Sequence, residues 1–361
     1  LSEPTKFFLD QGRGKCMARN QCQRGCSFGA YFSTLSSTLP AAIKTGNLEI
    51  ACNSVVHSVI YDEKTNRATG VNVIDEESLE TREYHGNMVF LCASTLGTAQ
   101  IMLNSTSPSF PDGIANSSGV LGHYLMDHIY NVSASGTIEG FDEDYYRGNR
   151  PTGPVIPRFV NLEGQTEKFA RGYFLRTNTR RLDVRRGSYT TEFGADFKRK
   201  MQRPGPWRLQ IGTSGEMTPR FENSVSLHPD KTDKWGMPQL LIDCKFTEND
   251  LLMMDGMREK CVELLEAVGA TDIESNISDD PPGLAIHEMG TARMGRDAKT
   301  SVLNGRNQCH DVPNLVVTDG ACMASSSHQN PSLTYMAITA RAANLAAEMY
   351  RNNDFQVTPD N

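Results

Sequence analysis

One histidine stands in a stretch of unusual composition in the C-terminal part of the chain. In AIHEMGTARMG, residues 285–295, His287 lies among two glycines, a threonine and two methionines, a pattern that fits neither helical nor strand periodicity. A second polar stretch, SSSHQNPSLTYMAITARAA at residues 325–343, contains His328 and Asn330. A histidine on glycine-containing backbone, near a helix N-terminus, is suited to act as a base close to neutral pH.

Three chemistries could use His287. A zinc site needs three or four ligands at workable spacing, and His287, His310 and His328 fall into no HxxxH or CxxC grouping, so no metal is expected. A serine hydrolase requires a G-x-S-x-G turn, which the sequence does not contain. The third chemistry is abstraction of a proton from a substrate hydroxyl beside an electron acceptor. A purely structural histidine is the alternative.

A strand and a helix are expected around these residues. NLVVTDGACM predicts a buried strand that ends at Asp319 and Gly320. A helix is expected from Pro331 to about Tyr350, because Asn330 is a good N-cap and proline fits the first helical position. One face of this helix carries mostly small residues, so we expect a neighbour to pack closely against it: Leu333, Met336, Ala337, Ala340, Ala343 and Ala347.

The rest of the chain divides into four regions. Residues 1–45 are predicted to be loop, and residues 47–77 a meander of strands. Residues 87–105 predict a short apolar strand, a turn and a helix. Residues 122–283 contain short, alternating, aromatic segments, which predict an antiparallel sheet with one clear helix at 247–268. The apolar positions expected on that helix are Leu251, Met254, Met257, Val262, Leu265 and Val268.

Charge and hydropathy exclude several kinds of partner. The chain has 361 residues, enough for one large or two interleaved domains. With 36 basic and 43 acidic residues its net charge is −7, which argues against binding to nucleic acid or to an anionic membrane surface. No apolar run approaches the roughly eighteen residues that a membrane helix needs, so no membrane span is expected.

The cysteines favour a reduced environment. There are nine, an odd number, which is unlike a secreted disulfide framework. A cytoplasmic location is therefore expected, and a periplasmic or secreted location is the alternative if a signal lies upstream of Leu1. Cys16, Cys22 and Cys26 have spacings that suit zinc poorly and lack an adjacent fourth ligand, so a structural role is favoured over a metal or redox role.

The two histidine-containing stretches resemble a known signature. HEMGTARMG and NLVVTDGACMASSSHQNPSLTYMAITARAA are similar to the C-terminal signature of the glucose–methanol–choline (GMC) family of flavin oxidoreductases. Weaker matches occur in the family's order along the chain: CQRGCSFGAYFSTLSSTLPAAI, NLEIACNSVVHSVIYD, VFLCASTLGTAQIML, GVLGHYLMDH and NSVSLHPDKTDKWGMPQL. The pair NP at 330–331, where many members have a second histidine, resembles pyranose-, cholesterol- and choline-oxidising members, and we expect the pyranose-oxidase-like side of the family.

The resemblance implies a fold of the combined α/β and α+β kind. Residues 1–121 would form part of an FAD-binding domain of the GMC/PHBH-like type, with a cysteine-containing loop, a β-meander and a strand–turn–helix. Residues 122–283 would form a substrate-binding domain with an antiparallel sheet. Residues 284–361 would return to the FAD-binding domain and carry the active site.

The resemblance also implies a catalytic pair. His287 would be the base that takes the hydroxyl proton while a hydride leaves the same carbon for flavin N5. Asn330 would hydrogen-bond the substrate oxygen. His328, two residues earlier in the chain, is expected to support this pair without touching the substrate.

Five further residues are expected to bind the cofactor FAD. Val56 would contact the adenine through its backbone, and Asp319 and Gly320 would approach the ribityl and phosphate region. Pro331 and Ser332 begin the final helix, whose N-terminal amides and partial positive charge would face the flavin pyrimidine.

One part of the family pattern is missing. The G-x-G-x-x-G loop that cradles a dinucleotide pyrophosphate is absent, because GRGKCM at Gly12 has the wrong third position and no preceding apolar strand. We therefore expect the N-terminal Rossmann βαβ unit to be absent from this chain. An N-terminal FAD-binding segment upstream of Leu1, or another subunit, would have to supply it.

The function expected from the sequence is FAD-dependent oxidation of an alcohol group, on a small-molecule alcohol, sugar or glycoside. The sequence leaves open whether the enzyme is an oxidase or a dehydrogenase. The alternative is a truncated, non-catalytic fragment or subunit that keeps the fold but cannot bind FAD without the N-terminal segment.

Overall fold

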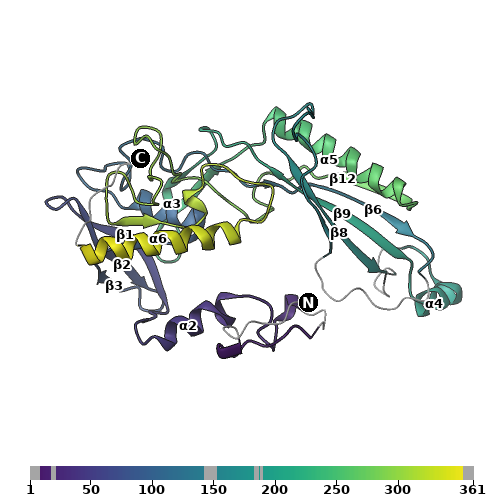
Figure 1. Cartoon of the computed structure of the whole chain (residues 1–361), viewed down its shortest axis with the longest axis horizontal. Helices are drawn as coiled ribbons and strands as arrows, with labels where there is room; N and C mark the ends of the chain where they lie inside the picture. Colours follow the sequence, from purple (N-terminus) through teal and green to yellow (C-terminus); the bar gives the residue numbers. More distant parts are fainter. Residues whose placement is uncertain (1–8, 18–21, 142–152, 183–186, 188–189, 353–361) are drawn as a thin grey trace.

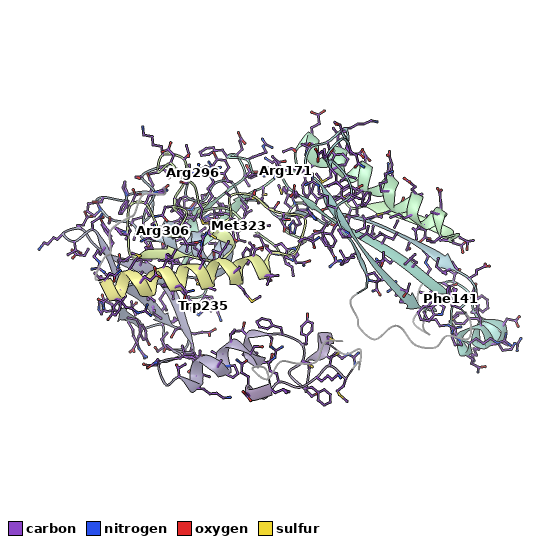
Figure 2. All side chains as sticks on the ribbon, viewed as in Figure 1. Phe141, Arg171, Trp235, Arg296, Arg306 and Met323 are labelled. Carbon is purple, nitrogen blue, oxygen red and sulfur yellow. The ribbon has the colours of Figure 1, made fainter. Side chains whose placement is uncertain are left out.

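The chain forms two lobes joined side by side. The computed structural model describes residues 9–17, 22–141, 153–182, 187 and 190–352. One lobe contains two small sheets, and the other is a long sheet with a helix against one face (Figure 1). Trp235 lies in the first lobe and Phe141 at the far end of the second (Figure 2).

The first sheet is the predicted meander. Its strands are β1 (Ser54–Asp62), β2 (Arg67–Asp75) and β3 (Thr81–His85), paired antiparallel in that order. β1 begins seven residues later than predicted from the stretch that starts at Asn47. The reason is local, because Asn53 has a φ of 54°, which interrupts extended backbone directly before Ser54.

A pair of parallel strands joins distant parts of the sequence. β4 (Val89–Leu91) pairs with β13 (Leu315–Val317). Each strand leads into a helix at its carboxyl end: α3 (Ser94–Asn104) follows β4, and the short η4 (Gly320–Cys322) and then α6 (Ser332–Asn352) follow β13. A continuous apolar core holds these elements together, and it includes Leu91, Met102, Ile114, Leu303 and Val317.

The second lobe is a six-stranded antiparallel sheet. Its path runs β12 (Thr271–Ile277), β6 (Val132–Ile138), β9 (Trp207–Glu216), β8 (Tyr173–Arg181) and β7 (Val155–Ile156), and β5 (His128–Ile129) pairs with β9. The helix predicted at 247–268 is confirmed as α5 (Glu248–Ala267), which begins at a capping box between Thr247 and Asp250. Its buried face consists of Met253, Met254, Met257, Cys261 and Leu265.

Some apolar positions predicted for that buried face were wrong. Leu251 and Val268 are 54% and 58% exposed. The helix repeats its buried positions from Met253 to Met257 to Cys261, a spacing that turns Leu251 toward solvent.

A hairpin connects the two lobes. β10 (Ser224–Thr232) and β11 (Pro238–Asp243) lie between strands of the long sheet in sequence, but they pack against α3. Val225 is buried with Ala99 and Leu125, and the Gln100 side chain donates a 2.7 Å hydrogen bond to the carbonyl of Pro238. The predicted domain boundaries, with FAD-binding segments at 1–121 and 284–361 and a substrate-binding segment at 122–283, stay predictions.

Two short helices did not appear among the predicted elements. α2 (Thr38–Lys44) lies in the stretch predicted as loop, and α4 (Gly194–Gln202) in the stretch predicted as sheet. The two helices have 7 and 9 residues, fewer than the window of about 11–18 residues in which helical periodicity is recognised. In Figure 1 α2 and the preceding segment lie apart from both lobes.

The final helix buries a different face from the one expected to be covered. Its buried residues are Ala342, Ala346 and Met349. In the part of the chain that the structure describes, the six residues of the small-residue face are exposed: Leu333, Met336, Ala337, Ala340, Ala343 and Ala347. The expected close neighbour is thus not among the described residues, because α6 contacts the body through the opposite side.

Gly320 marks the point where three of these segments come closest. A Cβ on this residue would collide with Thr95 Oγ1 of α3, and it would lie 2.5 Å from the carbonyl of Glu288 and 3.0 Å from the hydroxyl of Tyr335. We expect Gly320→Ala to lower the free energy of unfolding by about 1–3 kcal/mol, because the neighbours must move apart. Urea unfolding measures this, with Gly212→Ala as control, since a Cβ at Gly212 meets nothing within 4 Å. Equal stability of the two variants would contradict the close approach.

Candidate active site

A buried carboxylate holds the backbone that carries His287. Asp127, which directly precedes β5, is 2% exposed. Its two oxygens accept hydrogen bonds from the backbone amides of Gly283 (3.0 Å), Ala285 (3.0 Å) and His287 (3.1 Å). Ile286, inside this loop, has a φ of 54°, a conformation that β-branched residues rarely adopt. The three bonds to one carboxylate therefore hold the loop in a shape that its sequence does not favour.

The ring of His287 is held at both nitrogens. Its Nδ1 lies 2.9 Å from Nδ1 of His128 in β5, and its Nε2 lies 2.9 Å from the side-chain nitrogen of Asn330. His287 is half-buried and Asn330 is exposed. The structure thus brings together the two residues predicted as a catalytic pair. Nε2 of His287 is on the side of the ring that faces the exposed Asn330. Their catalytic roles stay predictions.

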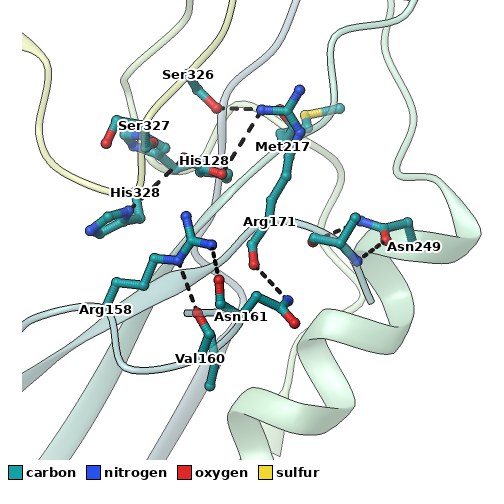
Figure 3. Close-up of polar contacts among 12 residues, drawn as sticks. His128, Arg158, Val160, Asn161, Arg171, Met217, Asn249, Ser326, Ser327 and His328 are labelled. Atoms are coloured by element: carbon teal, nitrogen blue, oxygen red, sulfur yellow. Dashed lines mark hydrogen bonds and ion pairs between the residues drawn. The ribbon is translucent and has the colours of Figure 1, made fainter. Parts of the chain in front are cut away.

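His128 lies behind this pair. Its side chain is 1% exposed, and its Nε2 contacts the backbone carbonyl of Ser327 (Figure 3). Burial lowers the pKa of His128 to about 4, against an opposing effect of the Ser327 carbonyl. Burial also lowers the pKa of His287, while the charges of Asp127 and Glu288 raise it in part. Both rings are therefore uncharged at neutral pH.

His328 does not contact the His287–Asn330 pair. Its Nδ1 lies 4.0 Å from a carboxylate oxygen of Glu216, and its ring centroid 6.2 Å from that of Phe174. Nδ1 is buried and has no hydrogen-bond partner within the described residues. His328 lies beside Ser327 and His128 in Figure 3, so its position agrees with a supporting place near the site.

The start of α6 differs in detail from the prediction. The helix begins at Ser332, one residue later than predicted, and the carbonyl of Pro331 accepts the amide of Tyr335 at 3.0 Å. The side chain of Asn330 bonds His287. Asn330 therefore lies directly before the start of the helix, while its side-chain amide is engaged with His287 across the site.

The residues predicted to bind cofactor lie along one edge of the parallel strands. Asp319 follows β13, and its carboxylate accepts hydrogen bonds from the Ala321 amide (2.8 Å) and the Thr98 hydroxyl (2.5 Å). Burial raises the pKa of Asp319, although these bonds oppose the shift. Ligands of α/β proteins bind outside the carboxyl ends of parallel strands, which is where Asp319 and Gly320 stand.

Val56 lines a cavity at the same edge. The cavity measures about 430 Å³ and is also lined by Cys92 and Ala93, at the carboxyl end of β4. Cys92 Sγ lies 3.2 Å from the hydroxyl of Thr318, the residue before Asp319. The cavity and Asp319 are thus neighbours on one edge.

These residues fit two parts of an FAD molecule. The cavity beside Val56 is large enough for an adenine, and apolar residues line it together with Tyr84 and His85. Near Gly320, the hydroxyl of Tyr335 is buried without a hydrogen-bond partner in the described ranges, so a polar ligand atom could satisfy it. The pyrophosphate between these parts would need other donors, since the sequence has no G-x-G-x-x-G loop.

Sequence reasoning missed Asp127 and His128. A signal existed, because a charged residue in the apolar stretch LMDHI is rarely buried without a partner. The partners of this stretch, however, lie more than 150 residues away in the sequence. The amides that bond the Asp127 carboxylate are 156 to 160 residues from it, and His287 is 159 residues from His128.

The cysteines, a metal site and a membrane span were also considered in the sequence, and the described part of the chain shows the following. Cys16, Cys22 and Cys26 are half-buried and form no disulfide. In the ranges that the structure describes, no three histidine, cysteine or acidic side chains gather as a metal site. None of the described helices is both long and apolar enough to cross a membrane.

Comparisons with known proteins agree on one family. Two models described as GMC oxidoreductase match this chain, over residues 8–130 and 219–339. The match over residues 8–130 corrects in part the prediction that the N-terminal unit of the family is absent, because these residues have a counterpart in the N-terminal family model. The G-x-G-x-x-G loop itself does not occur in the sequence.

Individual relatives and a solved structure extend over nearly the whole chain. A 2-methyl-1,2-propanediol dehydrogenase from Mycolicibacterium austroafricanum is 28% identical over 97% of this chain and 64% of its own length. The large subunit of a fructose dehydrogenase from Gluconobacter japonicus is 27% identical over 92% of this chain and 59% of its own length. The crystal structure of pyridoxine 4-oxidase from Mesorbium loti matches with a TM-score of 0.53 at 16% identity, over 90% of this chain and 63% of that one, and shares the fold. The chain thus spans less than two thirds of the proteins that it matches.

The buried ring of His128 gives a test of the site that needs no ligand. The unfolded chain protonates this histidine near its ordinary pKa of 6.5, and the folded chain only near 4. Between these values the unfolded state binds more protons, so stability is greatest above about pH 6.5 and is lost as the pH falls toward 4. From about pH 7 to about pH 5 the free energy of unfolding should fall by about 2 kcal/mol more in the parent than in His128→Asn. Urea unfolding at the two pH values measures this, and an identical pH dependence in both proteins would refute the burial of a neutral ring.

Proposed function

This chain belongs to the GMC oxidoreductase family, and on that premise we propose that it carries the catalytic residues for FAD-dependent oxidation of an alcohol. One observation supports the proposal above the others: His287 and Asn330 meet at 2.9 Å, on the accessible side of a buried network. An alcohol loses a proton from oxygen and a hydride from carbon when it becomes a carbonyl compound. The pair offers a group for the proton and a group for the oxygen.

His287 would take the proton at Nε2. Its pKa is lowered by burial, so the ring is a free base at neutral pH and needs no prior deprotonation. Asn330 would donate its amide hydrogen to the alcohol oxygen and hold it beside Nε2. FAD, when bound, supplies the acceptor for the hydride.

Residues of two strand ends and one helix would hold the cofactor. Val56 would contact the adenine, and Asp319 and Gly320 the ribityl and phosphate region. Pro331 precedes and Ser332 begins the 21-residue helix α6, whose first amides would carry partial positive charge toward the flavin pyrimidine. Donors for the pyrophosphate would come from an N-terminal FAD-binding segment or another subunit, because no G-x-G-x-x-G loop occurs in the sequence.

The substrate class that we favour is a sugar or another polyhydroxylated alcohol. Two residues after His128, the hydroxyl of Tyr130 accepts a hydrogen bond from Arg176, whose guanidinium lies 5.0 Å from the Tyr130 ring centroid. Arg176 is close enough to His287 to lower its pKa. A polar wall of this kind beside the base suits a substrate with several hydroxyl groups, and the relatives are named for a diol and for fructose.

A non-catalytic fragment or subunit that keeps the fold but cannot bind FAD without an N-terminal segment is the alternative. The two functions differ in a simple property. A chain that is yellow, or turns yellow with added FAD, supports the enzyme. A chain that stays colourless supports the alternative.

Replacing the base should abolish the reaction but leave the cofactor in place. In flavin-loaded protein we expect His287→Ala to slow flavin reduction by the alcohol about 10²–10⁴-fold, because proton abstraction by a positioned base contributes this much. Stopped-flow absorbance measures the rate, and the flavin spectrum before mixing checks occupancy. His228→Ala, on the hairpin strand β10, is the control. A rate within about twofold of the parent would defeat the assignment.

Replacing the amide should have a smaller effect. We expect Asn330→Ala to slow reduction by about 10-fold to 10³-fold, since it removes one donor to the developing negative charge. Its melting temperature should stay close to the parent value because Asn330 is exposed. The neighbouring exposed residue Gln329, changed to alanine, is the matched control. Equal rates for the two variants would exclude Asn330 from the reaction.

A further inference from the structure

We propose that His128 is a positioning residue that fixes the tautomer of His287, with the hydrogen on Nδ1 and the lone pair on Nε2. His128 is enclosed by protein and cannot touch a substrate. The inference rests on the proposed function in one respect, the naming of Nε2 as the atom that takes the proton. The tautomer itself is a property of the folded chain.

The first step concerns the far end of the network. Nε2 of His128 contacts the carbonyl oxygen of Ser327, which can only accept a hydrogen bond. His128 must therefore carry a hydrogen on Nε2. A neutral imidazole has one ring N–H, so Nδ1 of His128 is left with a lone pair.

The second step concerns the contact between the two rings. Nδ1 of His128 and Nδ1 of His287 are 2.9 Å apart while the ring centroids are 4.9 Å apart, so these two nitrogens make the contact. Because His128 presents a lone pair, the hydrogen between them belongs to His287. Burial lowers the pKa of His128 and outweighs the charge of Asp127, which raises it, while His328 also lowers it. Burial and Arg176 lower the pKa of His287, against Asp127 and Glu288.

The third step reaches the accessible side. His287 has used its only ring hydrogen at Nδ1, so its Nε2 accepts from the amide of Asn330 at 2.9 Å. One arrangement satisfies every contact in turn: Asn330 donates to His287, His287 to His128, and His128 to the Ser327 carbonyl. In the other tautomer two lone pairs would face each other across the Nδ1–Nδ1 contact, which is unfavourable in a buried position.

Nitrogen NMR of the chain without flavin tests this directly. With ¹⁵N-labelled histidine at neutral pH, and with the His287 signals identified by their loss in His287→Asn, we expect a protonated Nδ1 and an unprotonated Nε2. His128→Leu removes the acceptor, and the ratio of the Nδ1–H to the Nε2–H form should fall about fivefold, the equivalent of one ordinary hydrogen bond. His128→Asn, which returns an amide oxygen to the position of Nδ1, should restore the parent ratio. His85→Leu is the control for loss of a histidine.

Each result separates this inference from the proposed function. A parent protein with its hydrogen on Nε2 of His287 would overturn the inference, even if His128→Leu fails to fold. An unchanged ratio in a folded His128→Leu would also overturn it. If the parent has the expected tautomer but His287→Ala leaves flavin reduction intact, the proposed function fails and the tautomer assignment stands.

Discussion

The buried carboxylate of Asp127 is the interaction on which the candidate site depends. A charge with 2% exposure is tolerated only if hydrogen-bond donors replace its water, and here three backbone amides from residues 283–287 do so. Those bonds hold Ile286 in a left-handed backbone and set His287 against β5. The position of the histidine thus follows from the need to satisfy a carboxylate beside it.

A second constraint brings the cofactor residues to the same region. β4 and β13 pair in parallel although more than 200 residues separate them, as the register of Leu315 with Val89 shows. Parallel pairing puts both carboxyl ends at one edge, so Cys92 lies beside Thr318 and Asp319 there. Val56 of the meander lines the cavity that Cys92 also lines. α6 lies against this edge, where Thr339 bonds the carbonyl of Thr318, and its first residue follows Asn330 and Pro331. The strand ends predicted to bind the cofactor and the histidine predicted to take the proton therefore lie in the same region of the fold.

Several predictions from local patterns were correct, and the wrong ones share a cause. α5, α3, α6 and the meander follow from apolar period and turn residues, and all four exist. On α5, Leu251 and Val268 were expected on the buried face, yet both are exposed. The small residues on α6 indicated a covered face, yet Ala342, Ala346 and Met349 are the buried ones. Helix period shows that a face exists, but contact with the rest of the chain decides which face is used.

The sequence by itself determined which residue types are available at the site and the elements that carry them: His287 on irregular backbone, Asn330 before a helix, and Asp319 after a buried strand. The tertiary structure decided which of these groups meet, and it added Asp127 and His128, whose chemistry depends on amides and a ring more than 150 residues along the chain. The physical reason is that hydrogen bonding and burial act through space. A carboxylate or an imidazole acquires its role from the groups packed around it, and those groups leave no periodic trace in the residues next to it.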